Sequence, residues 1–183
     1  MEPAVIIISG APGSGKTAAA MFFRNRRIPT VRMGDITLSE IARRNMPQGW
    51  ESEKKVWKDM RKSLGDDIFA RAAFEKLKSS GGGKHKLAVI EGMRTMAEYD
   101  FFRKVFPEVK TVFIRCSDEK RYERLKKRKV RPLTVYQAKK RDRDEGESFQ
   151  LDSIRRKADF IVINDDGVED LYNNLANTLR KYL

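Results

Sequence analysis

Gly10-Ala11-Pro12-Gly13-Ser14-Gly15-Lys16-Thr17 is the stretch of sequence that decides the fold. It fits the pattern G-x-x-x-x-G-K-[ST] at every fixed position, and the segments on either side suit that pattern. Ala4-Val5-Ile6-Ile7-Ile8, which precedes it, is an apolar run typical of a buried parallel strand, and Ala18 to Phe23, which follows it, is helical in pattern. A strand, a glycine-rich turn and a helix N-terminus together predict a loop that binds the phosphates of a nucleotide.

The residues of this phosphate-binding loop have separate expected roles. Lys16 is expected to reach the β and γ phosphates, and the Thr17 hydroxyl is expected to ligate Mg²⁺. ATP and Mg²⁺ are therefore the cofactors that the motif predicts. The expected nucleotide-binding residues are Gly10, Ala11, Pro12, Gly13, Ser14, Gly15, Lys16, Thr17 and Ala18, together with Arg124 from later in the chain.

The composition indicates one compact domain. A chain of 183 residues is long enough to bury a full hydrophobic core without disulfides or metals. The single cysteine, Cys116, is expected to be a small buried residue, which leaves no disulfide framework and favours a reducing cytoplasm. No signal region and no apolar run of membrane-spanning length is evident in the sequence. We therefore expect a cytoplasmic protein without a membrane partner.

The charge of the chain points to an anionic partner. The formal net charge is +13 and the pI is near 9.9. Small polyanionic substrates and nucleic acid are the two classes that suit such a charge, and composition alone does not separate them. The aromatic residues fall at core spacing rather than among the basic runs, which favours the small substrate.

Apolar runs predict five strands, with helical patterns between them. The predicted strands are 4–8, 30–33, 87–90, 111–114 and 160–163. The predicted helical segments are 15–25, 36–79 with a break at 47–49, 97–105, 118–129, 132–154 with a break near Gly146, and 168–182. Strands that alternate with helices in this way predict an α/β fold with a parallel sheet covered on both faces.

Ligands on such sheets bind beyond the carboxyl ends of the strands. In this chain those ends are the phosphate-binding loop, Gly34-Asp35, Glu91-Gly92-Met93-Arg94 and Arg115-Cys116-Ser117. We expect all of them to meet at one crevice, because parallel strands place their carboxyl ends at the same edge of the sheet.

Two acidic residues follow predicted strands and are candidates for catalysis or metal binding. Glu91 can hold the water shell of Mg²⁺ or accept a proton from the phosphoryl acceptor, and the competing interpretation is a structural salt bridge. Asp35 has the equivalent position after the second strand, but it can equally cap a helix that begins at Ile36. Both interpretations stay open at this point.

Arginines supply the positive charge that phosphoryl transfer needs around the transferred group. Arg94 directly follows the third strand, and Arg124 and Arg128 share one helix face. The segment around Arg141 and Arg143 carries both charge signs, which is usual for a solvated helix face. We favour a mobile lid that brings both arginines to the transferred phosphate. The expected catalytic residues are Lys16, Glu91, Arg128, Arg141 and Arg143.

These features together resemble the nucleoside monophosphate kinase group of P-loop proteins. The resemblance rests on the phosphate-binding loop, Gly34-Asp35, the acid-Gly-x-Arg turn at 91–94, the pair Arg124 and Arg128, and the arginine-rich segment before the last strand. Within that group the chain is most similar to archaeal proteins of the UPF0200 type, which are related to dephospho-CoA kinases and adenylate kinases. The resemblance implies a single P-loop domain with strand order 2-3-1-4-5. It also implies a core of 1–33, 80–128 and 148–183, an acceptor-binding helical insertion at 34–79 and a lid at 129–147.

The resemblance implies substrate-binding residues as well. It makes Asp35, Arg94 and Arg43 candidates for binding the phosphoryl acceptor. Adenylate kinases carry an arginine three residues after the Gly-Asp pair, where this chain has Leu38. The residues that have to replace that arginine are Arg43, Arg44 or Arg61.

The expected function is therefore an ATP-dependent kinase whose acceptor is nucleotide-like or dephospho-CoA-like. Two alternatives remain. The first is a nucleic-acid-associated P-loop protein, either an RNA or DNA end kinase or a nucleotide-gated binder, which uses the basic runs at 120–131 and 155–157. The second is a regulator that binds nucleotide without catalysis.

Overall fold

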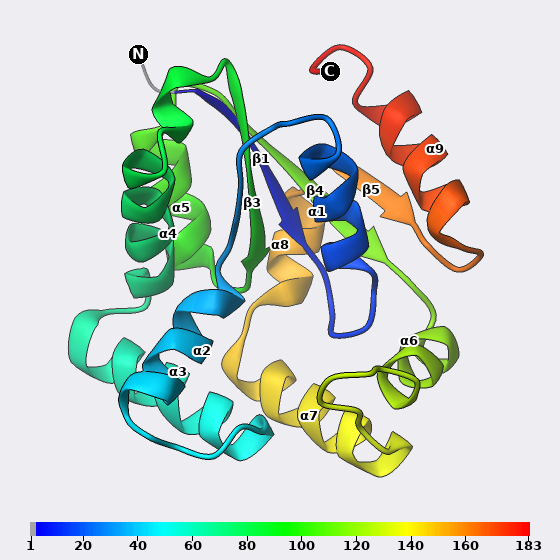
Figure 1. Cartoon of the computed structure of the whole chain (residues 1–183). Helices are drawn as coiled ribbons and strands as arrows, with labels where there is room; N and C mark the ends of the chain where they lie inside the picture. The colour runs from blue at the N-terminus through cyan, green and yellow to red at the C-terminus, as the bar shows by residue number, and fades with distance from the viewer. Residues whose placement is uncertain (1–2) are drawn as a thin grey trace.

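The computed structural model describes residues 3–183 and has one parallel sheet at its centre (Figure 1). Its strands are β1 (Ala4–Ser9), β2 (Thr30–Arg32), β3 (Leu87–Met93), β4 (Val109–Arg115) and β5 (Phe160–Ile163). They lie in the order β2-β3-β1-β4-β5, and every neighbouring pair is parallel. The α/β class and the strand order expected from the sequence are confirmed.

Helices fill the connections between the strands, and one more helix follows the last strand. Their bounds are α1 (Lys16–Arg24), α2 (Gly34–Arg43), α3 (Trp50–Leu64), α4 (Ile68–Ser79), α5 (Met96–Val105), α6 (Asp118–Lys126), α7 (Val135–Ser148), α8 (Leu151–Lys157) and α9 (Val168–Thr178), with a 3-10 turn, η1 (Gly82–Lys84), before β3.

Two helical layers cover the sheet. Helices α1 and α9 pack on one face, together with Ile6 and Ile8 of β1, and α4, α5 and α8 pack on the other, together with Val5 and Ile7 (Figure 1). Alternate residues of a strand point to opposite faces, so a strand buried on both faces is apolar throughout. This burial explains why the β1 sequence is an unbroken apolar run.

The remaining helices lie beyond the carboxyl ends of the strands. Helices α2, α3, α6 and α7 gather at the end of the molecule toward which the strand arrows point (Figure 1). Helices α2, α3 and α4 come from the segment between β2 and β3, and α7 comes from the segment between β4 and β5. Connections that leave the same edge of the sheet therefore meet there.

Strand β3 is longer than the sequence predicted. It continues past Ile90 to Met93, because Glu91 still pairs with Ile8 of β1 and Met93 pairs with Ser9 after a shift in register. The extension carries Glu91 within the sheet rather than after it. Its side chain is thereby fixed close to the phosphate-binding loop.

Helix α7 does not break near Gly146, which corrects the sequence prediction. It begins at a capping box in which Thr134 and Gln137 exchange hydrogen bonds, and it runs without interruption to Ser148. Gly146 is exposed, and its φ is not positive. The glycine is therefore a weak helix former that the surrounding helix tolerates.

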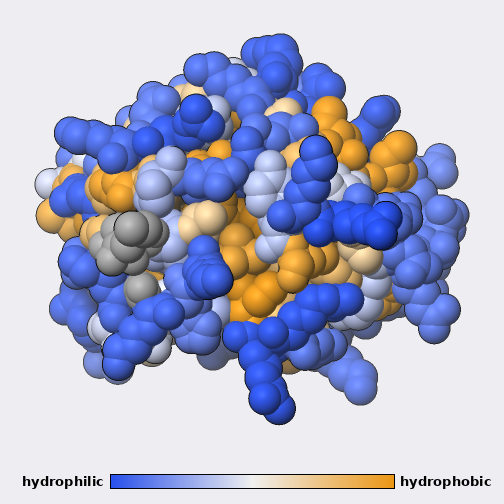
Figure 2. Space-filling model, turned by 90° about the horizontal axis from the view of Figure 1, so that it is seen from above, coloured by the Kyte–Doolittle hydropathy of each residue, from blue (hydrophilic) through white to orange (hydrophobic). Residues whose placement is uncertain are grey.

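The end of the molecule opposite these helices is largely hydrophilic. Figure 2 looks down on it and shows hydrophilic residues over most of the face, with an apolar area near the centre. Within residues 3–183, no helix has both the length and the apolar character needed to cross a bilayer.

Candidate nucleotide and acceptor site

A cavity of about 280 Å³ lies at the carboxyl ends of the strands. Its walls come from the phosphate-binding loop, from the ends of β2 and β3, from α3, and from the region of α6 and α7. The turn Arg115-Cys116-Ser117 after β4 does not line it, contrary to expectation, because α6 begins at once and contributes Arg124 in its place.

Two side chains hold the phosphate-binding loop from outside. Arg121 Nη1 donates to the carbonyl oxygen of Pro12 at 2.8 Å, and Asn164 Nδ2 donates to that of Ser14 at 2.7 Å. A Cβ atom at Gly15, whose φ is +105°, would lie only 2.1 Å from Asn164 Nδ2. These two hydrogen bonds hold the carbonyl oxygens of Pro12 and Ser14 toward the outside of the loop. The backbone N–H groups of the loop are then available to bind an anion.

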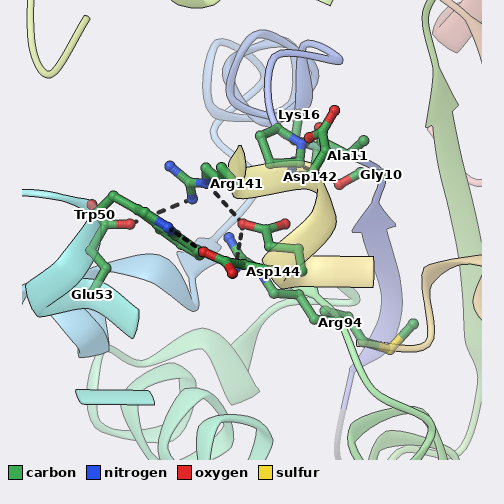
Figure 3. Close-up of polar contacts among 12 residues, drawn as sticks. Gly10, Ala11, Lys16, Trp50, Glu53, Arg94, Arg141, Asp142 and Asp144 are labelled. Atoms are coloured by element: carbon green, nitrogen blue, oxygen red, sulfur yellow. Dashed lines mark hydrogen bonds and ion pairs between the residues drawn. The ribbon is translucent and has the colours of Figure 1, made fainter. Parts of the chain in front are cut away.

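The ammonium group of Lys16 lies against the loop. Its Nζ donates to the carbonyl oxygens of Gly10 at 2.8 Å and of Ala11 at 2.9 Å (Figure 3). Burial, followed by the nearby charge of Arg94, lowers the pKa of Lys16 to about 7. A bound phosphate favours the charged form of such a group, because an opposite charge raises the pKa of an amine.

Thr17 and Glu91 form an oxygen pair beside the loop. Thr17 Oγ1 donates to Glu91 Oε1 at 3.1 Å, and Glu91 is buried. Within residues 3–183 the other oxygen, Oε2, accepts no hydrogen bond, although Arg32 Nε lies 4.0 Å from it. Hydroxyl and carboxylate oxygens suit Mg²⁺, which completes its octahedron with phosphate oxygens and water. The pair therefore fits a Mg²⁺ ion held by Thr17 directly and by Glu91 through water.

Arg124 on α6 and Arg128 just after it line the same cavity. Arg124 Nη1 donates to the carbonyl oxygen of Asn164 at 2.8 Å and contacts Cys116 Sγ at 3.3 Å. Arg128 makes no hydrogen bond or ion pair with any other residue in the described part of the chain. Loss of hydration, followed by the neighbouring charge of Arg141, lowers the pKa of Arg128 below its ordinary value. Unpaired guanidinium groups of this kind are suited to phosphate.

Helix α7 is tied to α3 at the edge of the cavity. Arg141 donates to Glu145 at 2.8 Å and to Glu53 on α3 at 3.4 Å, and its guanidinium carbon lies 4.4 Å from the ring centroid of Trp50 (Figure 3). Asp144 accepts a hydrogen bond from Trp50 Nε1 at 3.1 Å. The segment expected to form a lid therefore lies against α3 in this structure.

Two carboxylates neutralise the arginines between α3 and α7. Glu53 also accepts a hydrogen bond from Arg131, and Glu145 accepts one from Arg94 at 3.2 Å. Burial alone would raise the pKa of Glu145, but the charges of Arg94 and Arg141 outweigh it and hold the pKa below its ordinary value. Glu145 therefore stays charged at neutral pH, and both carboxylates lie among arginines that line the cavity.

The α3 side of the cavity is lined by aromatic rings around Arg61. Arg61 Nη2 donates to Glu98 Oε1 at 2.5 Å, and the fully buried Glu98 also accepts hydrogen bonds from the backbone N–H groups of Arg94 and Thr95. Glu98 belongs to the capping box that begins α5. One carboxylate therefore positions both Arg61 and the turn that follows β3.

Comparisons with known proteins show the family to which this chain belongs. A family model described as an AAA domain matches residues 6–149. A UPF0200 protein of Pyrococcus abyssi is 35% identical over 183 residues, covering 98% of this chain and 97% of that protein. The chain belongs to the UPF0200 family. A second member, from Thermococcus onnurineus, is 32% identical and covers 98% of each chain.

Solved structures show that this UPF0200 chain has the fold of P-loop kinases. The shikimate kinase from Bacteroides thetaiotaomicron superposes with a TM-score of 0.59 at 14% identity, covering 97% of this chain and 98% of that one. The shikimate kinase from Aquifex aeolicus gives a TM-score of 0.54 at 20% identity over 96% of each chain. The resemblance to UPF0200 proteins inferred from the sequence is confirmed by the relatives, and the expected fold is confirmed by these structures.

The structure brings most of the predicted site residues of this UPF0200 protein to one cavity. Those that line it are Pro12, Gly13, Gly15, Lys16, Thr17, Glu91, Arg94, Arg124, Arg128 and Arg141. Gly10 and Ala11 contribute carbonyl groups to Lys16 as described above, Ser14 is buried within the loop, and Ala18 lies in the first turn of α1.

Three predicted residues lie elsewhere. Arg143 is exposed on α7 and lines an external groove between α6 and α7, because two residues along a helix rotate a side chain by about 200°. Arg43 is exposed and donates twice to Glu40, at 2.7 Å each. Asp35 lies in the first turn of α2, accepts a hydrogen bond from Arg32 at 3.1 Å, and does not line the cavity.

Several residues of the site were not predicted as site residues from the sequence. Of the three arginines proposed to replace the one absent at Leu38, Arg61 lines the cavity and Arg43 and Arg44 do not. Arg32, Glu53 and Arg131 line the cavity as well. Of these, only Arg32, near the carboxyl end of the second predicted strand, has a position in the sequence that points to the site. Glu53 and Arg131 are 78 positions apart and show no local pattern.

Proposed function

We propose that this UPF0200 protein is a kinase that transfers the γ-phosphoryl group of ATP to a small acceptor. The observation that carries the proposal is the cavity in which the phosphate-binding loop, Arg124 and Arg128 face the arginine and aromatic side chains of α3. A donor site and an acceptor site that open into the same space suit direct transfer, because the reacting atoms have to lie about 3–3.5 Å apart.

The residues of the loop and of α6 would hold the donor. Lys16 would exchange the carbonyl oxygens that it now contacts for the β and γ phosphates, and Arg124 and Arg128 would neutralise charge on the transferred group. When bound beside Thr17 and Glu91, Mg²⁺ would supply charge neutralisation at the β and γ phosphates. An acceptor oxygen forms a bond to the γ phosphorus while the bond to the bridging oxygen breaks, and ADP leaves with that electron pair. When the acceptor is a hydroxyl group, its proton passes to water.

The acceptor class follows from the resemblance, which favours nucleotide-like or dephospho-CoA-like molecules. The shikimate kinases with the same fold widen this range to small hydroxy acids. The exposed Lys126, Lys127 and Lys129, beside the cavity, support a second candidate function, a kinase for nucleic-acid ends, because they supply charge for a phosphate backbone.

A screen of acceptors with full-length protein, ATP and Mg²⁺ tests the proposal. Nucleoside monophosphates, dephospho-CoA, hydroxy acids, sugars and RNA 5′ ends are compared by ADP formation. We expect acceptor-dependent turnover that Lys16→Ala abolishes, while Lys84→Ala, which removes an exposed lysine on η1, leaves it unchanged. Unimpaired turnover in Lys16→Ala contradicts the proposal, and ATP binding without turnover on any acceptor favours a regulator.

A further inference from the structure

Strand β5 presents apolar side chains to solvent at one edge of the sheet. It is the last strand in the order, and within residues 3–183 its only strand partner is β4 (Figure 1). Val162 packs with α9 and is buried, whereas Ile161 and Ile163 point to the opposite face and are 49% and 53% exposed. Helix α8 covers that face over β1 and β4, and the two isoleucines lie beyond it.

The composition of β5 is unusual for a strand at an edge. Edge strands commonly carry proline or charged side chains, particularly lysine, which prevent them from pairing with another chain. The sequence of β5 is Phe-Ile-Val-Ile and contains neither. The strand therefore has the composition of an interior strand, although half of its side chains are exposed at an open edge.

Helix α9 runs back along β5 and carries opposite charges at its two ends (Figure 1). Asn174 Nδ2 donates to the carbonyl oxygen of Ile163, where the strand ends, at 3.3 Å. The ring of Tyr182 lies beside that of Phe160, where the strand begins, with 6.2 Å between the ring centroids. Exposed acids gather at the first of these places and exposed bases at the second, and none of them forms an ion pair with another described residue. The acids are Asp166, Glu169 and Asp170, and the bases are Arg180 and Lys181.

A second copy of the chain matches both features when its β5 runs antiparallel to the first. A twofold axis beside Val162 places Ile161 of each copy opposite Ile163 of the other, and all four isoleucines then lie on the same face of the joined sheets. The acidic end of each α9 lies toward the basic end of the other, because the two helices run in opposite directions. The surface is thus complementary to itself, as a twofold interface requires.

We propose that the chain forms a twofold dimer through β5, in which Ile161 and Ile163 of each copy cover those of the other. Specific interfaces bury roughly 1,200–2,000 Å² in total, which is more than four isoleucine side chains supply. The contact therefore includes α9, whose acidic end meets the basic end of its copy. The inference goes beyond the proposed kinase function and does not depend on it, since neither isoleucine lines the cavity.

The mass of the full-length protein in solution tests the proposal. Sedimentation velocity over a hundredfold range of concentration should give twice the 21.2 kDa of the single chain. Ile161→Lys and Ile163→Lys place a charge inside the contact and should each raise the dissociation constant at least tenfold. Both side chains are half-exposed in the single chain, so circular dichroism should show an unchanged fold. Leu64→Lys, at the end of α3, is the matched control, because Leu64 is also 53% exposed.

An exchange of charges tests the antiparallel order. Asp170→Lys and Lys181→Glu each bring like charges together across the twofold axis, and each should weaken the dimer severalfold. The double variant restores opposite charges with their positions exchanged, and it should recover most of the wild-type affinity. Such recovery requires that the two ends of α9 meet between copies, because the two residues form no ion pair within one chain.

Three results would overturn the dimer. The first is a monomeric mass at every concentration, which leaves β5 to solvent or to a different protein. The second is a dimer that Ile161→Lys and Ile163→Lys leave as tight as the wild type, because the copies then meet at another surface. The third is a double charge variant that dimerises no better than the single variants, which contradicts the antiparallel order. None of these results bears on ATP binding, so the proposed kinase function is tested separately.

Discussion

Lys16 has a different protonation equilibrium in the folded and unfolded chain. Its pKa falls from 10.5 to about 7 on folding, through burial and the charge of Arg94. Between these values the unfolded chain holds a proton that the folded chain has released. The contribution of Lys16 to the free energy of unfolding therefore rises with pH from about 7 to 10.5.

Nucleotide binding should reverse this release. At pH 8 most Lys16 side chains of the ligand-free protein are neutral, and a bound phosphate stabilises the ammonium form, so binding of Mg–ATP takes up a proton. At pH 6 the proton is already present and uptake is much smaller. Calorimetry in buffers with different enthalpies of ionisation measures the uptake directly. Lys16→Met, which has no proton to gain, should show none at either pH, and equal uptake at pH 6 and 8 in the wild type contradicts the lowered pKa.

Helix α7 was predicted only in part from the sequence. The sequence predicts a charged helix with arginines near the crevice, but not which of Arg141 and Arg143 faces inward. In the structure Ala138, Arg141 and Glu145 follow helical spacing on the face that points inward, and Arg143 points away. The local signal for the inward face was Ala138, a small residue among charged neighbours. The residue on α3 that binds Arg141 on that face is Glu53, which lies 88 positions away in the sequence.

Replacement of Gly146 by Ala should stabilise the protein. The position is helical and exposed, and a Cβ atom there would meet nothing within 4 Å. Ala is favoured over Gly in a helix by up to about 1 kcal/mol, so the free energy of unfolding should rise by about 0.5–1 kcal/mol. Urea titration measures the change. Destabilisation would show that the helix is in fact interrupted at Gly146, as the sequence alone suggested.

Removal of the charge of Glu53 should loosen α7. Glu53→Gln leaves Arg131 and Arg141 without their shared carboxylate, and loss of a buried partner to a charged group costs about 1–3 kcal/mol. Amide hydrogen exchange in residues 135–148 should accelerate roughly tenfold or more, while the sheet stays protected. Glu51→Gln is the matched control, because its ion pair with Lys140 is exposed and surface pairs contribute little. If the amides of residues 135–148 exchange at the same rate in both variants, the Glu53 carboxylate does not hold α7 against α3.

At the scale of the whole molecule, the cavity at the carboxyl ends of the strands is lined mainly by positive charge. The cations that line the cavity are Lys16, Arg32, Arg61, Arg94, Arg124, Arg128, Arg131 and Arg141. They outnumber the acids in the same wall, which are Glu53, Glu91 and Glu98. A cavity lined by one sign of charge raises the local concentration of anions and accelerates their association.

The rate of nucleotide association should therefore fall with ionic strength. Stopped-flow measurements with a fluorescent ATP analogue should show a roughly tenfold decrease between low and high salt. Arg128→Gln should reduce both the rate and its dependence on salt, whereas the paired substitution Arg156→Gln and Lys157→Gln, on exposed residues of α8 that do not line the cavity, should not. An identical salt dependence in both variants would show that net charge alone steers the ligand.

The fold was more predictable than the site for a physical reason. Strands such as β1 and the phosphate-binding loop leave periodic or local patterns, because burial on both faces and a tight turn constrain consecutive residues. The cavity wall opposite the phosphate-binding loop is assembled from α3, α4, α5 and the region of α7, and its pairings, such as Arg61 with Glu98, form only when the helices pack. No window of the sequence contains both partners.

Arg121 connects the phosphate-binding loop to α7. The same guanidinium that holds the carbonyl oxygen of Pro12 also binds Asp142 on α7, at 2.6 Å, and Tyr122 donates to that aspartate at 2.8 Å. A mutational survey for weakened ATP affinity should consequently recover positions 121, 122 and 142, none of which lines the cavity. Substitutions that weaken nucleotide binding would therefore not be confined to residues that contact the nucleotide. They would extend to the residues that hold the phosphate-binding loop in position.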